Sequence, residues 1–299
     1  MKRVVFTLLY LAGVTRFAAW WNRKRVIFVC YHGVTKSAQR SPTDTTGLHV
    51  NHRRFANQLD FLAKRYAFIS LGEYLSARQD GRRLPDYSIL LTFDDGFRNF
   101  LTAAAPLLTA RRIPATVFLI TGHADFRSSA IGDTSWRPED DSNYLSWSEA
   151  RLLKEKYQID FGSHTCSHSP LLSLSPQEIE HELGHSRDCL SRNLAIETPS
   201  LSYPKGEQSQ MLAEQARKQG YGCAVTTDRG ANEFGHDLFT LGRTLVGDAD
   251  DKFSLAVRIS GVRYWLVCIR SLFVSRPELS SVKIEAPSLQ TEGSLQLLD

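Results

Sequence analysis

The sequence lacks the patterns that mark several specialised classes of protein. Its 299 residues include an odd number of cysteines and no CxxC pair; the cysteines are Cys30, Cys166, Cys189, Cys223 and Cys268. We therefore expect no disulfide framework and no cysteine zinc site, but buried thiols in a reducing compartment. No apolar run reaches the roughly 20 residues that cross a bilayer, which argues against a multi-span membrane protein.

The chain also has little net charge. Lys and Arg number 36 and Asp and Glu number 32, which gives +4 at pH 7, and this excess is too small to indicate nucleic-acid binding. Hydrophobic residues make up 42% and charged residues 23%, and these values exclude a chain that is disordered or collagen-like as a whole. The length fits two domains of about 150 residues, or one barrel of alternating strands and helices of about 250 residues.

The N-terminal segment combines basic and apolar residues. Two basic residues precede a mostly apolar run at 4–14, and Arg16, Trp20 and Trp21 follow it. The run is too short to span a bilayer, and no small-residue cleavage site of a signal peptide follows it. The pattern fits a helix that lies in the headgroup region of a membrane, with an ordinary first helix packed on the domain as the alternative.

A second basic amphipathic pattern lies near the other end. At 253–273, three arginines alternate with apolar residues, which indicates either a membrane-surface helix or a helix that closes the domain. From 275 onward the chain turns polar, and we expect a disordered tail. The expected organisation is an amphipathic or membrane-surface helix at 1–24, a barrel domain at 25–250, an amphipathic helix at 251–274 and the tail at 275–299.

Between these ends, strand and helix patterns alternate. Such alternation predicts an α/β protein with a parallel sheet and helical cover, and seven or so strands suggest a barrel, complete or incomplete. Function in such barrels lies at the carboxyl ends of the strands, where we also expect the polar stretch 124–143 to form a loop. Strands are predicted at 25–34, 67–70, 88–93, 116–121, 159–163, 201–203, 223–227 and 238–246, and helices at 52–66, 101–111, 147–157, 176–194 and 209–219.

Two polar motifs lie at predicted strand ends. Asp94 and Asp95 follow the strand at 88–93, and His164 and His168 follow the strand at 159–163. Adjacent carboxylates are costly without a cation, and two histidines four residues apart have a spacing typical of metal ligands. Taken alone, the two aspartates could form a solvated turn, and the two histidines could be ordinary loop residues. Together they predict one divalent metal on Asp95, His164 and His168, zinc or another first-row metal (Co, Ni, Mn or Fe).

These motifs resemble those of a known family. TFDDG at 92–96 and HTCSH at 164–168 are similar to the first two motifs of the polysaccharide deacetylases, the NodB-homology or family 4 carbohydrate esterases. The likeness extends over about residues 26–247 and includes YHGV at 31–34. It implies a distorted (β/α)7-type barrel in which Asp95, His164 and His168 hold the metal, and in which Asp94 is the general base that activates the attacking water.

Two later motifs depart from the family pattern. Where most members have a late Leu-x-His that supplies the general acid, this chain has LGR at 241–243, and where Arg-x-Pro-Tyr is usual it has SYPK at 202–205. Both departures resemble the branch that de-N-acetylates poly-N-acetylglucosamine, in which the early Tyr-His motif supplies the acid. Because amide hydrolysis needs the leaving amine to be protonated, we predict that His32 is the acid. A structural histidine is the alternative.

The resemblance suggests roles for three more regions. Arg243 is predicted to orient Asp94 and keep it ionised by its opposite charge. A backbone N–H in the turn after 203, that of Lys205, is predicted to stabilise the oxyanion, and Tyr203 and Pro204 to contact substrate. A nucleophile formed by Cys166 and a histidine is a rival prediction, but it leaves the pair of aspartates unexplained.

Several functions fit these residues. The first is metal-dependent removal of N-acetyl from an amino sugar in a polysaccharide, or in a lipid-linked or nucleotide-linked sugar. A de-N-formylase or O-acetyl esterase of the same fold is the second, and an inactive carbohydrate-binding relative is the third. Unpaired cysteines and basic ends favour peripheral attachment at the cytoplasmic side of the inner membrane, where the leaflet is anionic, and a periplasmic location is the alternative.

Overall fold

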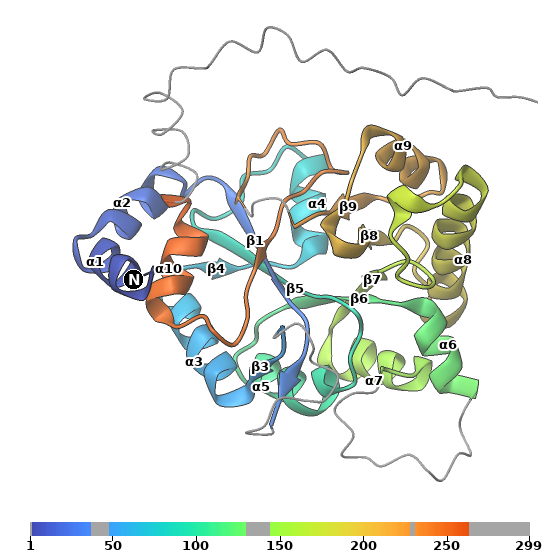
Figure 1. Cartoon of the computed structure of the whole chain (residues 1–299), viewed down its shortest axis with the longest axis horizontal. Coiled ribbons are helices and arrows are strands. Elements are labelled where there is room, and N and C mark those ends of the chain that lie inside the picture. Colours follow the sequence, from blue (N-terminus) through green and yellow to red (C-terminus); the bar gives the residue numbers. More distant parts are fainter. Residues whose placement is uncertain (1, 37–47, 130–143, 228–230, 263–299) are drawn as a thin grey trace, which may run out of the picture. The chain divides into compact units, whose positions relative to one another are not determined.

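The computed structural model describes residues 2–36, 48–129, 144–227 and 231–262 (Figure 1). At its centre is a curled sheet in which each strand runs parallel to the next. These strands are, in order, β1 (Val26–Tyr31), β5 (Ser88–Phe93), β6 (Ala115–Leu119), β7 (Asp160–Ser163), β8 (Ser200–Ser202) and β9 (Cys223–Val225). Every residue of β1 and β5 is buried, as expected for parallel strands covered on both faces.

The segment after β9 brings the two edges of the sheet together. Leu241 forms a parallel bridge to Val225, and β11 (Thr244–Leu245) pairs in parallel with β1. This segment therefore lies between the last strand and the first, and the sheet curls into the distorted barrel of the predicted fold class. Shorter strands extend it: β10 (Ala231–Asn232) is antiparallel to β1, β4 (Ala67–Phe68) pairs with β5, and β2 (Val34–Thr35) pairs with β3 (Val50–Asn51).

Helices cover the sheet, and local sequence fixes where several of them begin. Ser146 with Glu149, and Ser175 with Glu178, form capping boxes at the first turns of α7 and α8. The helices are α3 (His52–Ala63), α4 (Leu71–Gln79), α5 (Ala105–Ala110), α6 (Thr121–Ser129), α7 (Trp147–Tyr157), α8 (Pro176–Leu194) and α9 (Gln210–Lys218).

Some predicted elements differ from the observed ones. The loop predicted at 124–143 begins as helix α6, because Ala124 packs into the core while polar neighbours face outward; residues 130–143 lie outside the described part. The strand predicted at 238–246 is reduced to the Leu241 bridge and β11. Helix α4 had no counterpart among the predicted helices.

The described ends of the chain pack together. Helices α1 (Lys2–Leu11) and α2 (Val14–Trp21) lie beside α10 (Lys252–Ser260), although they come from opposite ends of the sequence (Figure 1). No single helix in the described ranges is long and apolar enough to cross a membrane. Together α1 and α2 meet the length and composition, but they are bent by 71°. The parts of the predicted C-terminal helix and tail from 263 onward lie outside the described residues.

Candidate active site

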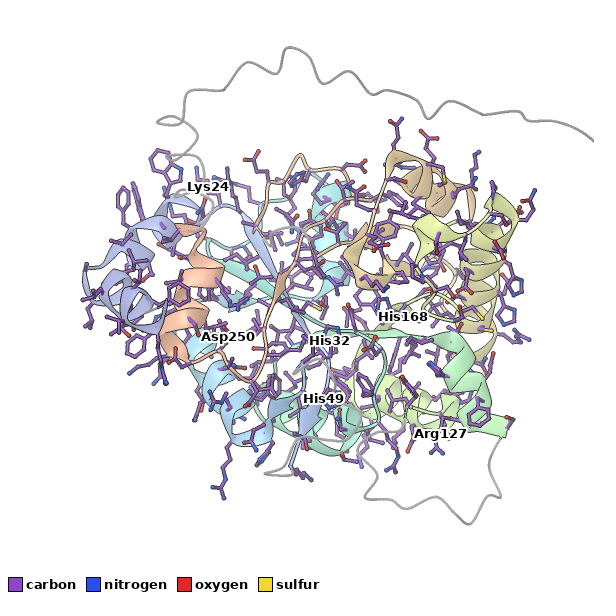
Figure 2. All side chains as sticks on the ribbon, viewed as in Figure 1. Lys24, His32, His49, Arg127, His168 and Asp250 are labelled. Atoms are coloured by element: carbon purple, nitrogen blue, oxygen red, sulfur yellow. The ribbon has the colours of Figure 1, made fainter. Side chains whose placement is uncertain are left out.

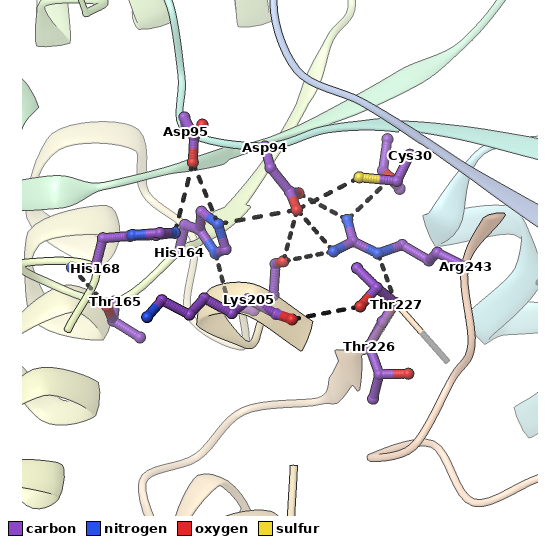
Figure 3. Close-up of polar contacts among 12 residues, drawn as sticks. Cys30, Asp94, Asp95, His164, Thr165, His168, Lys205, Thr226, Thr227 and Arg243 are labelled. Atoms are coloured by element: carbon purple, nitrogen blue, oxygen red, sulfur yellow. Dashed lines mark hydrogen bonds and ion pairs between the residues drawn. The ribbon is translucent and has the colours of Figure 1, made fainter. Parts of the chain in front are cut away.

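The three predicted metal ligands converge where β5 and β7 end (Figure 3). Oδ1 of Asp95 lies 3.4 Å from Nε2 of His164 and 3.7 Å from Nε2 of His168. Ligand atoms held at about 2.1 Å by a tetrahedral cation are about 3.4 Å apart, so the spacing of these donors fits a zinc-like ion. The residue types and the geometry therefore both suit a metal of this class.

The backbone and a neighbouring carbonyl orient these ligands. Nδ1 of His164 donates a hydrogen bond of 2.8 Å to the carbonyl oxygen of Ser202, which leaves Nε2 as the nitrogen that faces Asp95. Asp95 and His168 adopt left-handed backbone conformations, with φ of 70° and 63°. Such conformations are uncommon outside glycine and cluster at functional sites, where the surrounding fold enforces them.

Asp94 lies in a buried network around Arg243, and its Oδ2 is also 3.8 Å from Nε2 of the metal ligand His164 (Figure 3). Two hydrogen bonds of 2.7 Å join the guanidinium to the two carboxylate oxygens, and the Arg243 side chain is 0% exposed. Ser202 Oγ also donates to Asp94, at 3.2 Å. Burial alone would raise the pKa of Asp94, but the charge and hydrogen bonds of Arg243, together with the nearby charges of His164 and His32, outweigh it and hold the pKa well below its ordinary value. Asp94 is thus ionised, as a general base must be.

His32 lies on the other side of this network, directly after β1. A ring nitrogen of His32, an Asp94 oxygen and the Cys30 sulfur all lie within 4.8 Å of one another, and Figure 2 shows His32 and His168 near the middle of the view. Nδ1 of His32 is buried without a hydrogen-bond partner in the described structure. Burial lowers the pKa of His32, although the charges of Asp95 and Asp94 oppose this. An unpaired buried imidazole is uncommon in a purely structural position.

The turn after β8 gives a mixed outcome. Lys205 lies in the turn Pro204–Gly206 with φ of 58°, and its side chain is exposed; its predicted use of a backbone N–H stays a prediction. Tyr203 is fully buried, and its hydroxyl donates to the carbonyl of Phe239. The Tyr203 side chain therefore supports the turn from inside the core, and its predicted contact with substrate stays a prediction. Pro204 is likewise buried in the turn, and its predicted contact with substrate also stays a prediction.

The rival thiol nucleophile is not favoured by its surroundings. Cys166 is half-buried, and burial and the charges of Glu182 and Asp125 raise the pKa of its thiol. Nucleophilic cysteines need the pKa to be lowered instead.

Sequence reasoning missed a residue that holds the metal-ligand loop. Glu182 on α8 is buried, and its Oε2 accepts the backbone N–H groups of Cys166 and Ser167, each at 2.9 Å. Its Oε1 accepts the Ser167 hydroxyl at 2.6 Å. The carboxylate thus fixes the chain between the two histidine ligands. The spacing along the sequence gave no signal for it, because the contact depends on how α8 packs.

An aromatic group beside the site was also missed. The rings of His123 and Tyr144 stack with centroids 4.1 Å apart, and Tyr144 stacks on Phe97 at 5.2 Å. The charge of Asp95 acts on both His123 and Tyr144, which places the group near the metal ligands. Flat rings at the edge of a polar site are suited to hold the apolar face of a ligand.

Comparison with known proteins adds relatives by sequence. The family model described as polysaccharide deacetylase matches residues 81–224. YxkH of Bacillus subtilis is 28% identical over 158 residues, which are 53% of this chain and 51% of YxkH, so the chain spans about half of that relative. The poly-beta-1,6-N-acetyl-D-glucosamine N-deacetylase of Staphylococcus epidermidis is 27% identical over 218 residues, 70% of this chain and 71% of that protein.

Solved structures agree in fold. The deacetylase PplD of Streptococcus pyogenes, solved in complex with acetate, has a TM-score of 0.66 and 25% identity and covers 79% of this chain and 98% of its own. IcaB from Ammonifex degensii has a TM-score of 0.63 and 24% identity, over 79% of this chain and 97% of its own, and supports the fold alone. Residues 81–224 therefore match the polysaccharide deacetylase domain, and the chain has the NodB-type α/β barrel fold.

Proposed function

We propose that this protein is a metal-dependent hydrolase that removes the N-acetyl group from an amino sugar of a polysaccharide. The observation that carries the proposal is that two adjacent carboxylates, those of Asp94 and Asp95, lie in different environments suited to different roles. Asp95 faces two histidines at separations that suit ligands of one metal ion, whereas a buried arginine keeps Asp94 ionised. A protein that only binds carbohydrate has no need of this arrangement.

The residues can carry out amide hydrolysis in balanced steps. A divalent cation on Asp95, His164 and His168 would polarise the acetyl carbonyl and make the attacking water more acidic. Asp94 accepts a proton as the water oxygen bonds to the carbonyl carbon, and the Lys205 N–H donates to the developing oxyanion. His32 then donates a proton to the nitrogen as the carbon–nitrogen bond breaks. The products are acetate and a free amino sugar.

Two observations support a poly-N-acetylglucosamine-like substrate. A relative that aligns with 70% of this chain at 27% identity is named as a deacetylase of that polymer. The stacked group of Phe97, His123 and Tyr144 offers a flat surface for a sugar ring next to the metal ligands. We include attachment to the cytoplasmic surface of the inner membrane in this proposal, supported by the apolar surface of α1 and α2 and by four unpaired cysteines in the described residues.

Mass spectrometry of N-acetylated glucosamine oligomers tests the proposal. We expect the wild type to release acetate and to leave products lighter by one acetyl group. Asp94→Asn and His32→Ala are expected to lower kcat by about 10²–10⁴-fold, because each removes a proton-transfer group. In parallel assays on N-formylated and on O-acetylated oligomers, release of formate or of O-linked acetate without any N-acetyl release would assign the site to another acyl group. No release by metal-loaded wild type would contradict the proposal.

A further inference from the structure

A second group of metal-ligating side chains lies outside the active site, between helices α6 and α8. Asp125 on α6 faces His185 and Cys189 on α8, and one donor atom from each lies within 4.8 Å of the others. The distances are 3.4 Å from Cys189 Sγ to His185 Nε2, 3.5 Å from Sγ to Asp125 Oδ2, and 3.8 Å from Nε2 to Oδ2. None of these residues has a role in the proposed hydrolysis.

These separations match those around a zinc ion. With bonds of about 2.3 Å to sulfur and about 2.0–2.1 Å to nitrogen or oxygen, tetrahedral ligand atoms lie about 3.3–3.6 Å apart. The three observed distances therefore need only small side-chain movements to accept the ion. His185 and Cys189 are four residues apart on one helix, so they share a face, and Asp125 closes the group from the neighbouring helix.

Neighbouring side chains orient the donors for this purpose. The Trp147 indole N–H donates to Oδ1 of Asp125 at 2.7 Å, which leaves Oδ2 as the oxygen that faces Cys189 and His185. A hydrogen bond of this kind fixes a ligating carboxylate in known metal sites. Arg192 donates to the Cys189 sulfur at 3.4 Å. Burial and the charge of Asp125 raise the pKa of this thiol, so a bound ion would have to displace the thiol proton.

Exposure gives the group an open side. Cys189 is fully buried, whereas the side chains of Asp125 and His185 are 44% and 39% exposed. A fourth position therefore faces solvent. On binding, a zinc–sulfur bond would replace the thiol S–H and its proton would pass to water, so that one thiolate and one carboxylate balance the charge of the ion.

The location links this group to the active-site loop. The first residues of α6, Thr121 and Gly122, donate their backbone N–H groups to the carbonyls of Thr165 and Cys166. From the other side, Glu182 of α8 accepts the N–H groups of Cys166 and Ser167. An ion shared by α6 and α8 would connect the two helices that hold the loop between His164 and His168.

We propose that Asp125, His185 and Cys189 form a second zinc site that joins α6 to α8 behind the metal-ligand loop. Metal-free full-length protein is loaded with Co²⁺ or with Zn²⁺ and desalted. The readouts are metal content per chain and the near-ultraviolet charge-transfer absorption that a thiolate ligand gives to Co²⁺. The wild type is expected to hold a second ion per chain and to show the band, whereas Cys189→Ser loses both the band and that ion.

Controls separate this site from the catalytic one. Cys166→Ser, which changes a nearby thiol outside the group, should keep the band. His168→Gln, which weakens metal binding at the active site, should also keep it. His185→Gln changes a half-exposed side chain and should lower cobalt affinity at the thiolate site by about tenfold or more, so the proposal stays testable if Cys189→Ser misfolds. Absence of the band in the wild type, or its persistence in Cys189→Ser, would overturn the proposal.

Discussion

At the scale of single residues, a buried charge pair sets the chemistry of the site. Asp94 is 3% exposed and would be protonated in that environment without a cation, and the Arg243 guanidinium supplies the cation through two parallel hydrogen bonds. The hydroxyls of Thr92 and Ser202 and the carbonyl of Thr226 accept the remaining arginine N–H groups, which fixes the orientation of the guanidinium. The pair is thus a fixed unit whose loss would be felt in both activity and stability.

Replacing Arg243 is expected to change the pH dependence of activity. In the wild type the pKa of Asp94 is lowered, so this base stays ionised until the pH falls well below the ordinary pKa of an aspartate. In Arg243→Gln the pKa of Asp94 rises because burial is no longer opposed by the guanidinium, and the acid limb of kcat/KM moves to higher pH. Removing one partner of a buried pair also costs about 3–5 kcal/mol, measurable by denaturant unfolding.

Arg243→Lys is the matched control for this prediction. It keeps the charge but not the paired hydrogen bonds, so its acid limb should lie between those of the wild type and Arg243→Gln. A pH profile of Arg243→Gln that coincides with the wild type would show that Arg243 does not set the ionisation of Asp94.

Glu182 gives a second prediction at this scale. Glu182→Gln keeps the shape of the side chain but weakens the bonds that hold the backbone of Cys166 and Ser167. We expect metal affinity at the active site to fall about 10–100-fold, as measured by competition with a chelator. Glu180→Gln, on the exposed face of the same helix, is the control and should bind like the wild type. Equal affinities for both variants would contradict a positioning role.

The contrast between these residues shows what sequence could and could not predict of the site. Asp94, Asp95, His164 and His168 follow strands directly, and the carboxyl ends of parallel strands meet at one place, so sequence position alone brings them together. Glu182, Cys30 and Ser202 reach the site because of how their helix or strand packs against its neighbours. The spacing of residues along the sequence does not predict such packing. Their contacts became visible only in the packed structure.

At the scale of elements, the turn Pro204–Gly206 depends on one glycine. Gly206 has φ of +72°, and a Cβ there would lie 2.0 Å from Thr227 Oγ1 and 2.7 Å from the Thr227 backbone nitrogen. Gly206→Ala is therefore expected to destabilise the fold by about 1–3 kcal/mol and to lower kcat by displacing the Lys205 N–H. Gly235→Ala, where the added atom meets open space, is the control. Unchanged kcat and thermal unfolding in Gly206→Ala would contradict this account of the turn.

Elements were predicted best where a pattern was long and its ends were marked. Helix α8 was predicted over the observed range, because Ser175 and Pro176 mark its start. Helix α4 was missed although Ser70 caps it and Glu73 follows at the right spacing, because its buried residues form a short pattern interrupted by Gly72. The last strand was predicted too long, since its residues divide their pairing between β9 and β1.

At the scale of the whole molecule, exposed apolar side chains concentrate on α1 and α2. Val4, Leu8, Leu11, Phe17 and Trp21 are each at least half exposed on these two helices. Two basic residues of the same region, Arg16 and Lys24, have no acidic partner in the described structure, and Figure 2 labels Lys24 beyond the end of α2. Apolar surface rimmed by cations suits an anionic bilayer.

Vesicle sedimentation tests this surface. The wild type should bind vesicles that contain phosphatidylglycerol more strongly than vesicles of phosphatidylcholine alone, and less strongly at high salt. A double variant, Trp20→Ala with Trp21→Ala, should lose most of this binding because it removes the interfacial aromatic rings. Phe126→Ala, which removes an exposed ring from α6, is the control and should bind like the wild type. Equal binding to neutral and anionic vesicles would contradict the prediction.

The pairing of Asp94 with Arg243 has a consequence for biosynthesis. The two residues are 149 positions apart, so a ribosome working at about 5–20 residues per second makes the arginine about 7–30 s after the aspartate. During that interval Asp94 has to stay hydrated, because burying it alone would leave an uncompensated charge. The core around Asp94 therefore cannot be completed until Arg243 has been synthesised. Activity is expected only after nearly the whole domain has been translated.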